Sequence, residues 1–362
     1  MSSKPGIPVS SIYCFGSGEF GQTTQTIDTN SPVLALKDMN IINIYTGSWN
    51  SAALTTDGDL MAWGRIDSVK STNQTANLYD ETKDENNTNG NLPPSFNQVP
   101  VLAQSSVKSV ALNDYHTIVI NQQEFIHFPT FDNQLISISN ATDVFSRYKS
   151  VIIFKKETIY FYSPLKGIPN EFQLPHPEIP IKAEITQNGF AILSDNQTLR
   201  IYTEKESDSP IIINDVISVS ASKDKYILLK PNGRIYTTCS NGGLVQIYGI
   251  CGNPISVFAG GAHYGCVTFE GDCWTWGIGV KGQLGTASFT NSIRPKKVIL
   301  KEGMKVISAA AGEEHTVLLA VKDTFFVPTL PDPMKKNEYM KMIRMDAAIP
   351  GAFVASEYDS KF

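Results

Sequence analysis

Two segments near opposite ends of the chain read almost alike, and this internal repeat is the feature that most constrains the fold. The first, at 13–22, is Tyr-Cys-Phe-Gly-Ser-Gly-Glu-Phe-Gly-Gln, and the second, at 275–285, is Thr-Trp-Gly-Ile-Gly-Val-Lys-Gly-Gln-Leu-Gly. A shorter copy, Met-Ala-Trp-Gly, occupies 61–64. Repeated short units build arrays in which each unit packs on its neighbours. The chain is therefore expected to form one repeat architecture rather than several unrelated domains.

A second recurring element, Ala-Gly-x-x-His followed by an apolar run, sets the phase of the repeat. Its clearest copies begin at Ala259 and Ala311. The histidine position, called the marker below, recurs seven times: Asn50, His116, Lys149, Gly189, Lys225, His263 and His315. An apolar residue follows each marker at a constant offset, although the distance between markers varies. A hairpin of two strands is therefore repeated, and the outer connections differ in length.

The residues around each marker predict short β-strands. Asp57-Gly58 and Asn232-Gly233 stand between apolar runs, and such dipeptides favour tight hairpin turns. The runs themselves, such as Val-Ile-Ile-Phe at 151–154, are typical of strands buried on both faces. Radial repetition of small sheets protects the sheet edges that a flat array of this size would expose. The predicted fold is all-β, a seven-bladed β-propeller with a short C-terminal helical tail.

We expect the chain to divide into an N-terminal arm (1–9), the propeller (10–328) and a C-terminal tail (329–362). An acidic loop insertion at 78–92 explains the longest interval between markers. Methionines and other apolar residues at helical spacing predict a short helix over about 334–348. This helix would pack on the propeller rim or dock a partner. Residues 12–15 are in phase with the first strand of a unit and should pair with the 312–320 segment, although 325–327 competes for the same place.

Three motifs together resemble the repeat of the regulator of chromosome condensation family. They are Trp-Gly-x-Gly-x-x-Gly-Gln-Leu-Gly at 276–285, Arg-Pro-Lys-Lys-Val at 294–298 and Ala-Gly-x-x-His-Thr at 311–316. The resemblance implies a seven-bladed β-propeller with repeats of about fifty residues. A WD-repeat propeller is the alternative, and it is disfavoured because no tryptophan of this chain is followed by aspartate.

Two patterns that could indicate catalysis or cofactor binding have structural explanations. Segments 16–21 and 277–282 match GxGxxG, but neither precedes a helical run that could receive a pyrophosphate. Cysteine and histidine residues cluster late in the chain, yet they lack the close pairs typical of structural zinc: Cys239, Cys251, His263, Cys266 and Cys273. We therefore predict glycine turns and buried free thiols, with no catalytic residue, no cofactor and no metal.

Charge and hydropathy limit the partners. The formal net charge is −5 and the pI about 5.6, which disfavours binding driven by a basic field. No apolar stretch is long enough to span a bilayer, and residues 1–10 lack the apolar core of a signal peptide. We expect a monomeric cytoplasmic protein, with the nucleus as the alternative, that does not bind DNA directly.

The family resemblance implies a non-enzymatic protein-interaction propeller that regulates a small GTPase. The alternative is a guanine-nucleotide exchange factor for a GTPase of the Ran, Rab or Arf type. The turns that lead into the markers should gather on one face and supply the binding residues. The candidates are Trp49, Asp114, Tyr115, His116, Arg147, Tyr148, Asp224, His263, Glu313, Glu314 and His315. Two structural alternatives remain: the histidines bond the backbone of their own turns, and Trp49, Tyr115 and Tyr148 pack between blades.

Overall fold

The computed structural model describes residues 9–65, 96–104, 106–114, 117–124, 126–129, 135–163, 171–203, 209–239 and 242–325. These residues form strands, turns and one 3-10 segment, η2 (Asp323–Phe325), and no α-helix occurs among them. The prediction of an all-β propeller is confirmed. The predicted tail helix at 334–348 and the insertion at 78–92 lie outside the described residues.

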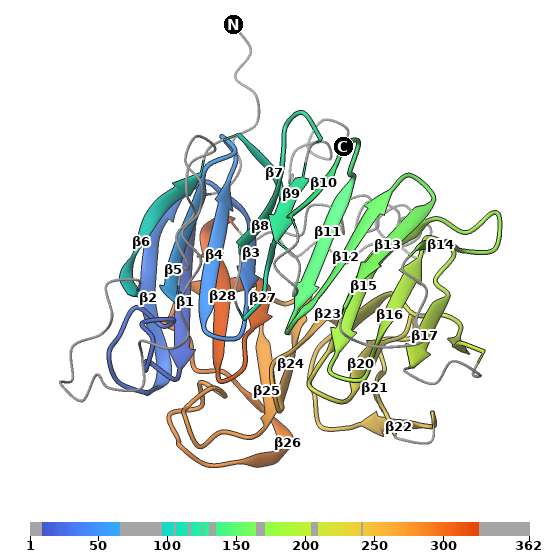
Figure 1. The fold of residues 1–362 in the computed structure, drawn as a ribbon. Helices are drawn as coiled ribbons and strands as arrows, with labels where there is room; N and C mark the ends of the chain where they lie inside the picture. The colour runs from blue at the N-terminus through green and yellow to red at the C-terminus, as the bar shows by residue number, and fades with distance from the viewer. Residues whose placement is uncertain are drawn as a thin grey trace, which may run out of the picture.

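The strands form seven four-stranded antiparallel sheets, named here A to G, that stand around a common centre (Figure 1). Six sheets use four consecutive strands each. Sheet B holds β3 (Ile41–Thr46), β4 (Asn50–Thr55), β5 (Leu60–Arg65) and β6 (Phe96–Gln104); sheet C holds β7 (Val107–Leu112), β8 (Thr117–Asn121), β9 (Ile126–Pro129) and β10 (Leu135–Ile138). Sheet D holds β11 (Asp143–Arg147), β12 (Ser150–Lys155), β13 (Thr158–Tyr162) and β14 (Glu171–Gln173); sheet E holds β15 (Pro180–Thr186), β16 (Gly189–Ser194), β17 (Leu199–Thr203) and β18 (Ile211–Ile213).

Sheets F and G follow the same plan. Sheet F holds β19 (Ser218–Ala221), β20 (Tyr226–Leu229), β21 (Ile235–Thr238) and β22 (Leu244–Ile247); sheet G holds β23 (Pro254–Ala259), β24 (His263–Thr268), β25 (Cys273–Gly277) and β26 (Ser292–Lys297). Sheet A combines the two ends of the described chain: β27 (Met304–Ala311), β28 (His315–Lys322), β1 (Ser10–Gly16) and β2 (Thr29–Met39), in that order.

The predicted hairpins are present, with each marker at or just before the second strand of its sheet. Gly58 and Gly233 occupy the hairpin turns with φ of +82° and +76°. Residues other than glycine adopt this backbone conformation only at a cost in free energy. Every residue of β4, β16 and β20 is buried, as expected for strands covered on both faces. The short apolar runs of the sequence therefore become the second strands of the sheets.

The hydrophobic core lies between the sheets rather than within a single centre. Seven clusters of buried residues occur, one at each contact between neighbouring sheets. Phe15 and Leu318 of sheet A, for example, pack with Phe258 and Val267 of sheet G. Because each sheet supplies apolar side chains to both neighbours, no sheet can be removed without exposing two core layers.

The ring closes by pairing the N-terminal strand with the C-terminal one, as the sequence predicted. β1 is antiparallel to β28, with Ile12 opposite Leu319 and Phe15 opposite Thr316. The prediction that 12–15 is a first strand was wrong, because β1 is the third strand of sheet A and aligns with β25 in the repeat. The place beside β28 is taken by β1; of the competing segment, residue 325 belongs to η2, and 326–327 lie outside the described residues.

Deleting residues 1–16 should open this ring. The deletion removes the partner of β28 together with Ile12 and Phe15, which are fully buried. Burying one large apolar side chain contributes about 1.5–3 kcal/mol, so we expect the free energy of unfolding to fall by about 5 kcal/mol or more. Denaturant titration measures the change, with deletion of 1–8 as the control. Equal stability of the two truncated proteins would contradict closure by β1.

Candidate functional site

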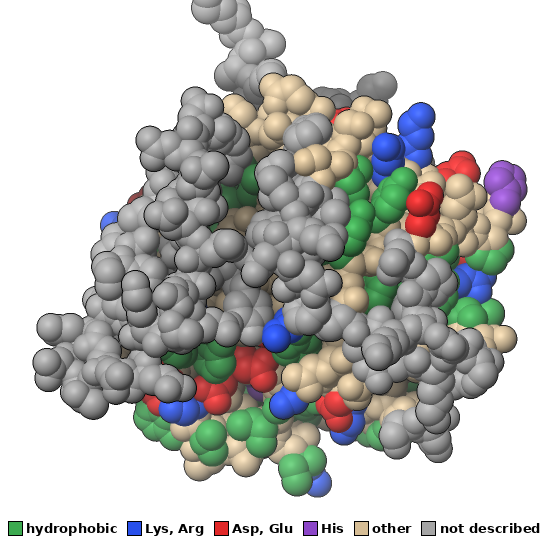
Figure 2. Space-filling model, in the orientation of Figure 1, with side chains coloured by type: hydrophobic (Ala, Val, Ile, Leu, Met, Phe, Trp, Pro, Cys, Tyr) green, Lys and Arg blue, Asp and Glu red, His purple; other side chains and the backbone are tan. Residues whose placement is uncertain are grey.

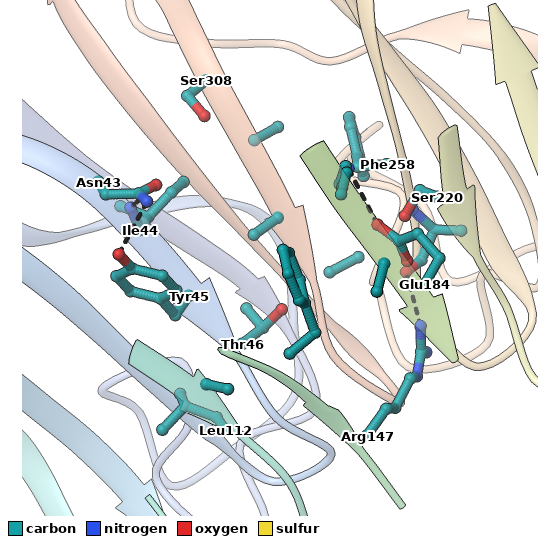
Figure 3. A pocket seen from close by; sticks show the side chains of 18 of the residues that line it. Asn43, Ile44, Tyr45, Thr46, Leu112, Arg147, Glu184, Ser220, Phe258 and Ser308 are labelled. Atoms are coloured by element: carbon teal, nitrogen blue, oxygen red, sulfur yellow. Dashed lines mark hydrogen bonds and ion pairs between the residues drawn. The ribbon is translucent and has the colours of Figure 1, made fainter. Parts of the chain in front are cut away.

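A central channel runs between the innermost strands of all seven sheets. Its cavity volume is about 390 Å³, and its lining includes residues of β3, β7, β11, β15, β19, β23 and β27. Figure 3 shows polar side chains among apolar ones on this wall, with Arg147 extending toward Glu184 and Ser220. Burial raises the pKa of Asp143 to about 6, although its carboxylate accepts hydrogen bonds from Ser109 (2.5 Å) and the amide of Val144 (2.9 Å). The channel is thus a narrow, partly polar space.

Side chains of one sheet satisfy the free backbone edge of the next sheet along the channel. The carboxylate of Glu184 accepts a hydrogen bond from the amide of Ala221 at 2.8 Å, and Lys182 donates to the carbonyl of Val219 at 2.7 Å. Ser220 in turn accepts a hydrogen bond from the amide of Ala259 at 3.0 Å. These contacts connect sheet E to F and sheet F to G.

Backbone hydrogen bonds connect the turns that precede the markers into a belt at one end of the channel. The amide of Gln187 donates to Lys223, that of Lys223 to Gly261, that of Gly261 to Glu313, and that of Glu313 to Ser48, over 2.9–3.2 Å. The belt therefore joins the turns of sheets E, F, G, A and B. The turns gather on one face as the sequence suggested.

Four candidate residues meet at this end and are called the mouth cluster: Asp114, Arg147, Tyr148 and Glu313. Ser48 donates a hydrogen bond to Asp114, and Arg147 reaches across the channel to donate to the carbonyls of Ala221 and Ala259. The guanidinium of Arg147 also lies over the ring of Tyr148, at 5.4 Å from its centroid. The mouth cluster thus combines one cation, two carboxylates and one phenol from sheets A, C and D.

Burial changes the acidity of two mouth residues. Burial raises the pKa of Tyr148 to about 12; the charge of Arg147 opposes this shift, whereas Glu313 and Asp114 reinforce it. Burial also raises the pKa of the Asp114 carboxyl, while the hydrogen bond from Ser48 and the charge of Arg147 lower it. The phenol therefore keeps its proton at neutral pH and can donate a hydrogen bond.

The remaining candidates are not all in the mouth cluster. Trp49, which follows Ser48 in the chain, is half-buried and in edge-to-face contact with Phe20 at 5.2 Å, and Asp224 is exposed at the turn of sheet F. Glu314 instead interacts electrostatically with Lys281 in the β25–β26 loop of sheet G and with Glu19 in the β1–β2 loop of its own sheet, as well as with Glu313. Tyr115 and His116 lie outside the described residues.

The prediction that His263 and His315 belong to the partner-binding face was wrong, because both side chains are fully buried. The structural alternative was that each imidazole bonds the backbone of its own turn. The structure instead shows a contact between each ring and a side chain of the next sheet. Nε2 of His263 lies 2.9 Å from the hydroxyl of Thr316, and Nε2 of His315 lies 2.9 Å from the hydroxyl of Ser51, in each case on the next sheet. Burial, together with nearby positive charge in the case of His263, lowers both pKa values to about 3, so the rings are neutral at physiological pH.

The sequence patterns above did not predict two features of these histidine contacts. The hydroxyl partners Ser51 and Thr316 directly follow markers, so a Ser or Thr after the marker was the available signal. The glycines three residues before the markers are also required. A Cβ on Gly260 or Gly312 would lie 2.1 Å from Cε1 of His263 or His315. Ala-Gly-x-x-His is therefore a packing motif, in which glycine makes room for the imidazole.

The cysteines are free thiols, and three of them are buried. All five cysteines are free, and burial raises the thiol pKa of Cys14, Cys266 and Cys273. Among the described residues, no group of three or more His, Cys, Asp or Glu side chains could hold a metal ion. In that same part of the chain, no helix is long and apolar enough to cross a membrane.

The ring of sheets around a central channel makes this protein a β-propeller. Residues 270–319 match the model of the regulator of chromosome condensation (RCC1) repeat, so the resemblance to this family that the motifs predicted is confirmed over that segment. It is 42% identical over 72 residues to the mouse E3 ubiquitin-protein ligase HERC2 (19% of this chain, 2% of that protein). It is 35% identical over 66 residues to the X-linked retinitis pigmentosa GTPase regulator homolog of Caenorhabditis elegans (18% of this chain, 5% of that protein).

The fold is similar to a solved structure over nearly the whole chain. Prp20p of Saccharomyces cerevisiae, studied for its binding to Gsp1p and histones, superposes with a TM-score of 0.66 at 12% identity. The match covers 93% of this chain and 95% of that one. In contrast, the chain spans only a few per cent of the length of the two relatives found by sequence. The likeness in sequence is thus local, whereas the likeness in fold is global.

The buried histidines predict a pH-dependent stability. Unfolded histidine takes a proton below about pH 6.5, whereas His263 and His315 stay neutral to about pH 3 in the folded protein. Their stabilising effect is complete above about pH 6.5 and is lost as the pH falls toward 3, by up to about 1.4 kcal/mol per pH unit for each histidine. Urea unfolding between pH 7 and 4 measures this slope.

Replacing both residues by asparagine, which occupies the marker position in sheet B, should flatten that slope. The comparison isolates the histidines because other titrating groups, including Asp143, are common to both proteins. The exposed His176→Asn variant controls for the loss of a histidine as such. An unchanged slope in the double variant would show that the two rings are not the source.

Proposed function

We propose that this protein is a non-enzymatic interaction propeller that regulates a small GTPase through the turn end of its channel. The observation that carries the proposal is the mouth cluster together with Trp49. Half-buried Trp, Tyr and Arg side chains supply most of the binding energy in protein interfaces. The similarity in sequence to the C. elegans GTPase regulator homolog and the fold shared with Prp20p support this class of partner.

More specifically, we propose as the alternative that the protein is a guanine-nucleotide exchange factor for a GTPase of the Ran, Rab or Arf type. Exchange requires no covalent chemistry, because a protein that binds the nucleotide-free GTPase more tightly shifts the equilibrium toward nucleotide release. The carboxylates of Asp114 and Glu313 suit a partner with basic side chains at its contact surface.

Further properties belong to the same proposal. The seven sheets, with a core layer at each contact, support a seven-bladed ring. The acidic net charge supports a protein that does not bind DNA directly, and the free cysteines support a reducing compartment. We place the protein in the cytoplasm as a monomer, with the nucleus as the alternative.

Trp49→Ala and Tyr148→Ala should each weaken GTPase binding by about thirtyfold or more, to the point of abolishing capture of the partner, without unfolding the protein. Truncating a hot-spot aromatic costs about 2 kcal/mol or more in affinity, which is roughly a thirtyfold loss. Biolayer interferometry against purified Ran, Rab and Arf proteins, each GDP-bound and nucleotide-free, measures binding. Release of a fluorescent GDP analogue tests exchange on any GTPase that binds.

Tyr248→Ala is the matched control, because Tyr248 is 72% exposed and follows β22, the outer strand of sheet F. All three variants should keep their melting temperatures within a few degrees of the parent. Loss of folding in the Trp49 and Tyr148 variants would show that these aromatics are core residues. Binding to no GTPase in either nucleotide state would overturn the proposed function.

A further inference from the structure

Exposed apolar side chains concentrate around the outer strand of sheet G. Ile293 of β26 is 96% exposed, and Ile299, just beyond this strand, is 62% exposed. Val280 and Phe289, in the loop that joins β25 to β26, are 55% and 46% exposed. Figure 2 shows hydrophobic side chains at the lower edge of the molecule, where Figure 1 places this lobe, with Lys and Arg side chains between them.

The loop that carries these residues is held by hydrogen bonds at both ends. The amide of Gly279 donates to the Asn291 side chain at 2.9 Å, and the amide of Ile299 donates to the carbonyl of Gly285 at 3.3 Å. Leu284, at its centre, is fully buried. The exposed side chains are therefore displayed by an anchored loop and a strand, so little conformational entropy is lost when they bind.

The same region is basic although the whole chain is acidic. Residues 278–305 contain six Lys and Arg against one Glu, while the chain has a net charge of −5. Lys281 and Lys297 are paired with Asp28 (3.4 Å) and Asp272 (2.7 Å). Arg294, Lys296 and Lys301 are exposed, and no acidic group among the described residues lies within ion-pair distance of them. This part of the surface thus carries uncompensated positive charge.

We propose that this region is a docking surface for an anionic lipid membrane. We call it the rim patch, formed by Val280, Phe289, Ile293 and Ile299 with the cations Arg294 and Lys296. Apolar side chains enter the interfacial layer, and each neighbouring Lys or Arg is attracted by anionic headgroups. Ile293 is almost completely exposed and so does not line a groove. Side chains that project in this way suit a fluid bilayer better than the complementary surface of a folded protein.

The rim patch is separate from the mouth cluster, so this inference does not rest on the proposed function. β26 is the outermost strand of its sheet, whereas the mouth cluster surrounds the channel at the innermost strands. The acidic residues Glu19, Asp28 and Glu314 interact with Lys281, which compensates their charge beside the loop. A membrane contact through the outer strand therefore leaves the channel mouth accessible.

Vesicle flotation of the full chain tests the proposal. We expect binding to phosphatidylcholine vesicles that contain about one-fifth phosphatidylserine, at least about tenfold weaker binding to pure phosphatidylcholine, and a loss of binding at high salt. Phe289→Ser with Ile293→Ser, and separately Arg294→Gln with Lys296→Gln, should each lower the partition coefficient at least about tenfold. Near-identical melting temperatures would show that the variants fold.

Matched controls alter equivalent exposed residues elsewhere. Ile212→Ser with Tyr248→Ser removes two exposed apolar side chains, and Lys223→Gln with Lys225→Gln removes two exposed cations. Both control pairs should bind vesicles like the parent. Absence of vesicle binding, equal affinity for both vesicle types, or equal losses in patch and control variants would each overturn the proposal. A partner protein captured by the patch without vesicle binding would also count against it.

Discussion

The unpaired edge of each innermost strand is the constraint on which this ring depends. A strand at a sheet edge presents amide and carbonyl groups that cost free energy if they are buried without partners. Here the preceding sheet supplies those partners, as Glu184 does for Ala221 and Ser220 does for Ala259. The belt of turn hydrogen bonds does the same at the end of the channel. Each sheet is thereby positioned by polar contacts as well as by the apolar layer beside it.

The same constraint explains why the repeat is clear in some units and faint in others. Where the marker is histidine, as in sheets G and A, the ring bonds a hydroxyl on the next sheet and requires a glycine beside it. In sheet C, whose marker His116 lies outside the described residues, Asn113 donates a hydrogen bond to Ser146 of sheet D at 2.9 Å. The markers Lys149 and Lys225 are exposed, in contrast to the buried histidines. Different residues can meet one geometric requirement, so the motif weakens while the fold persists.

The ring presents two surfaces of different chemistry. At the mouth, Arg147 crosses the channel to two carbonyls and leaves Asp114, Tyr148 and Glu313 around it, a mainly acidic and aromatic surface. On the rim of sheet G, apolar residues stand among the exposed cations Arg294 and Lys296. Because one surface is at the innermost strands and the other at an outermost strand, a protein and a membrane could be held at the same time.

Local patterns in the sequence determined the elements of this protein. Asp-Gly and Asn-Gly dipeptides specified hairpin turns, continuous β-branched runs specified buried strands, and the similar segments at the two ends indicated a closed ring. These features depend on neighbours in the chain, so a single sequence reveals them. The tertiary structure decided which residues face a partner. His263 and His315 looked like surface ligands, but the next sheet buries them against Thr316 and Ser51. Arg147 bonds carbonyls two and three sheets away, and such contacts between distant segments exist only after the ring has closed.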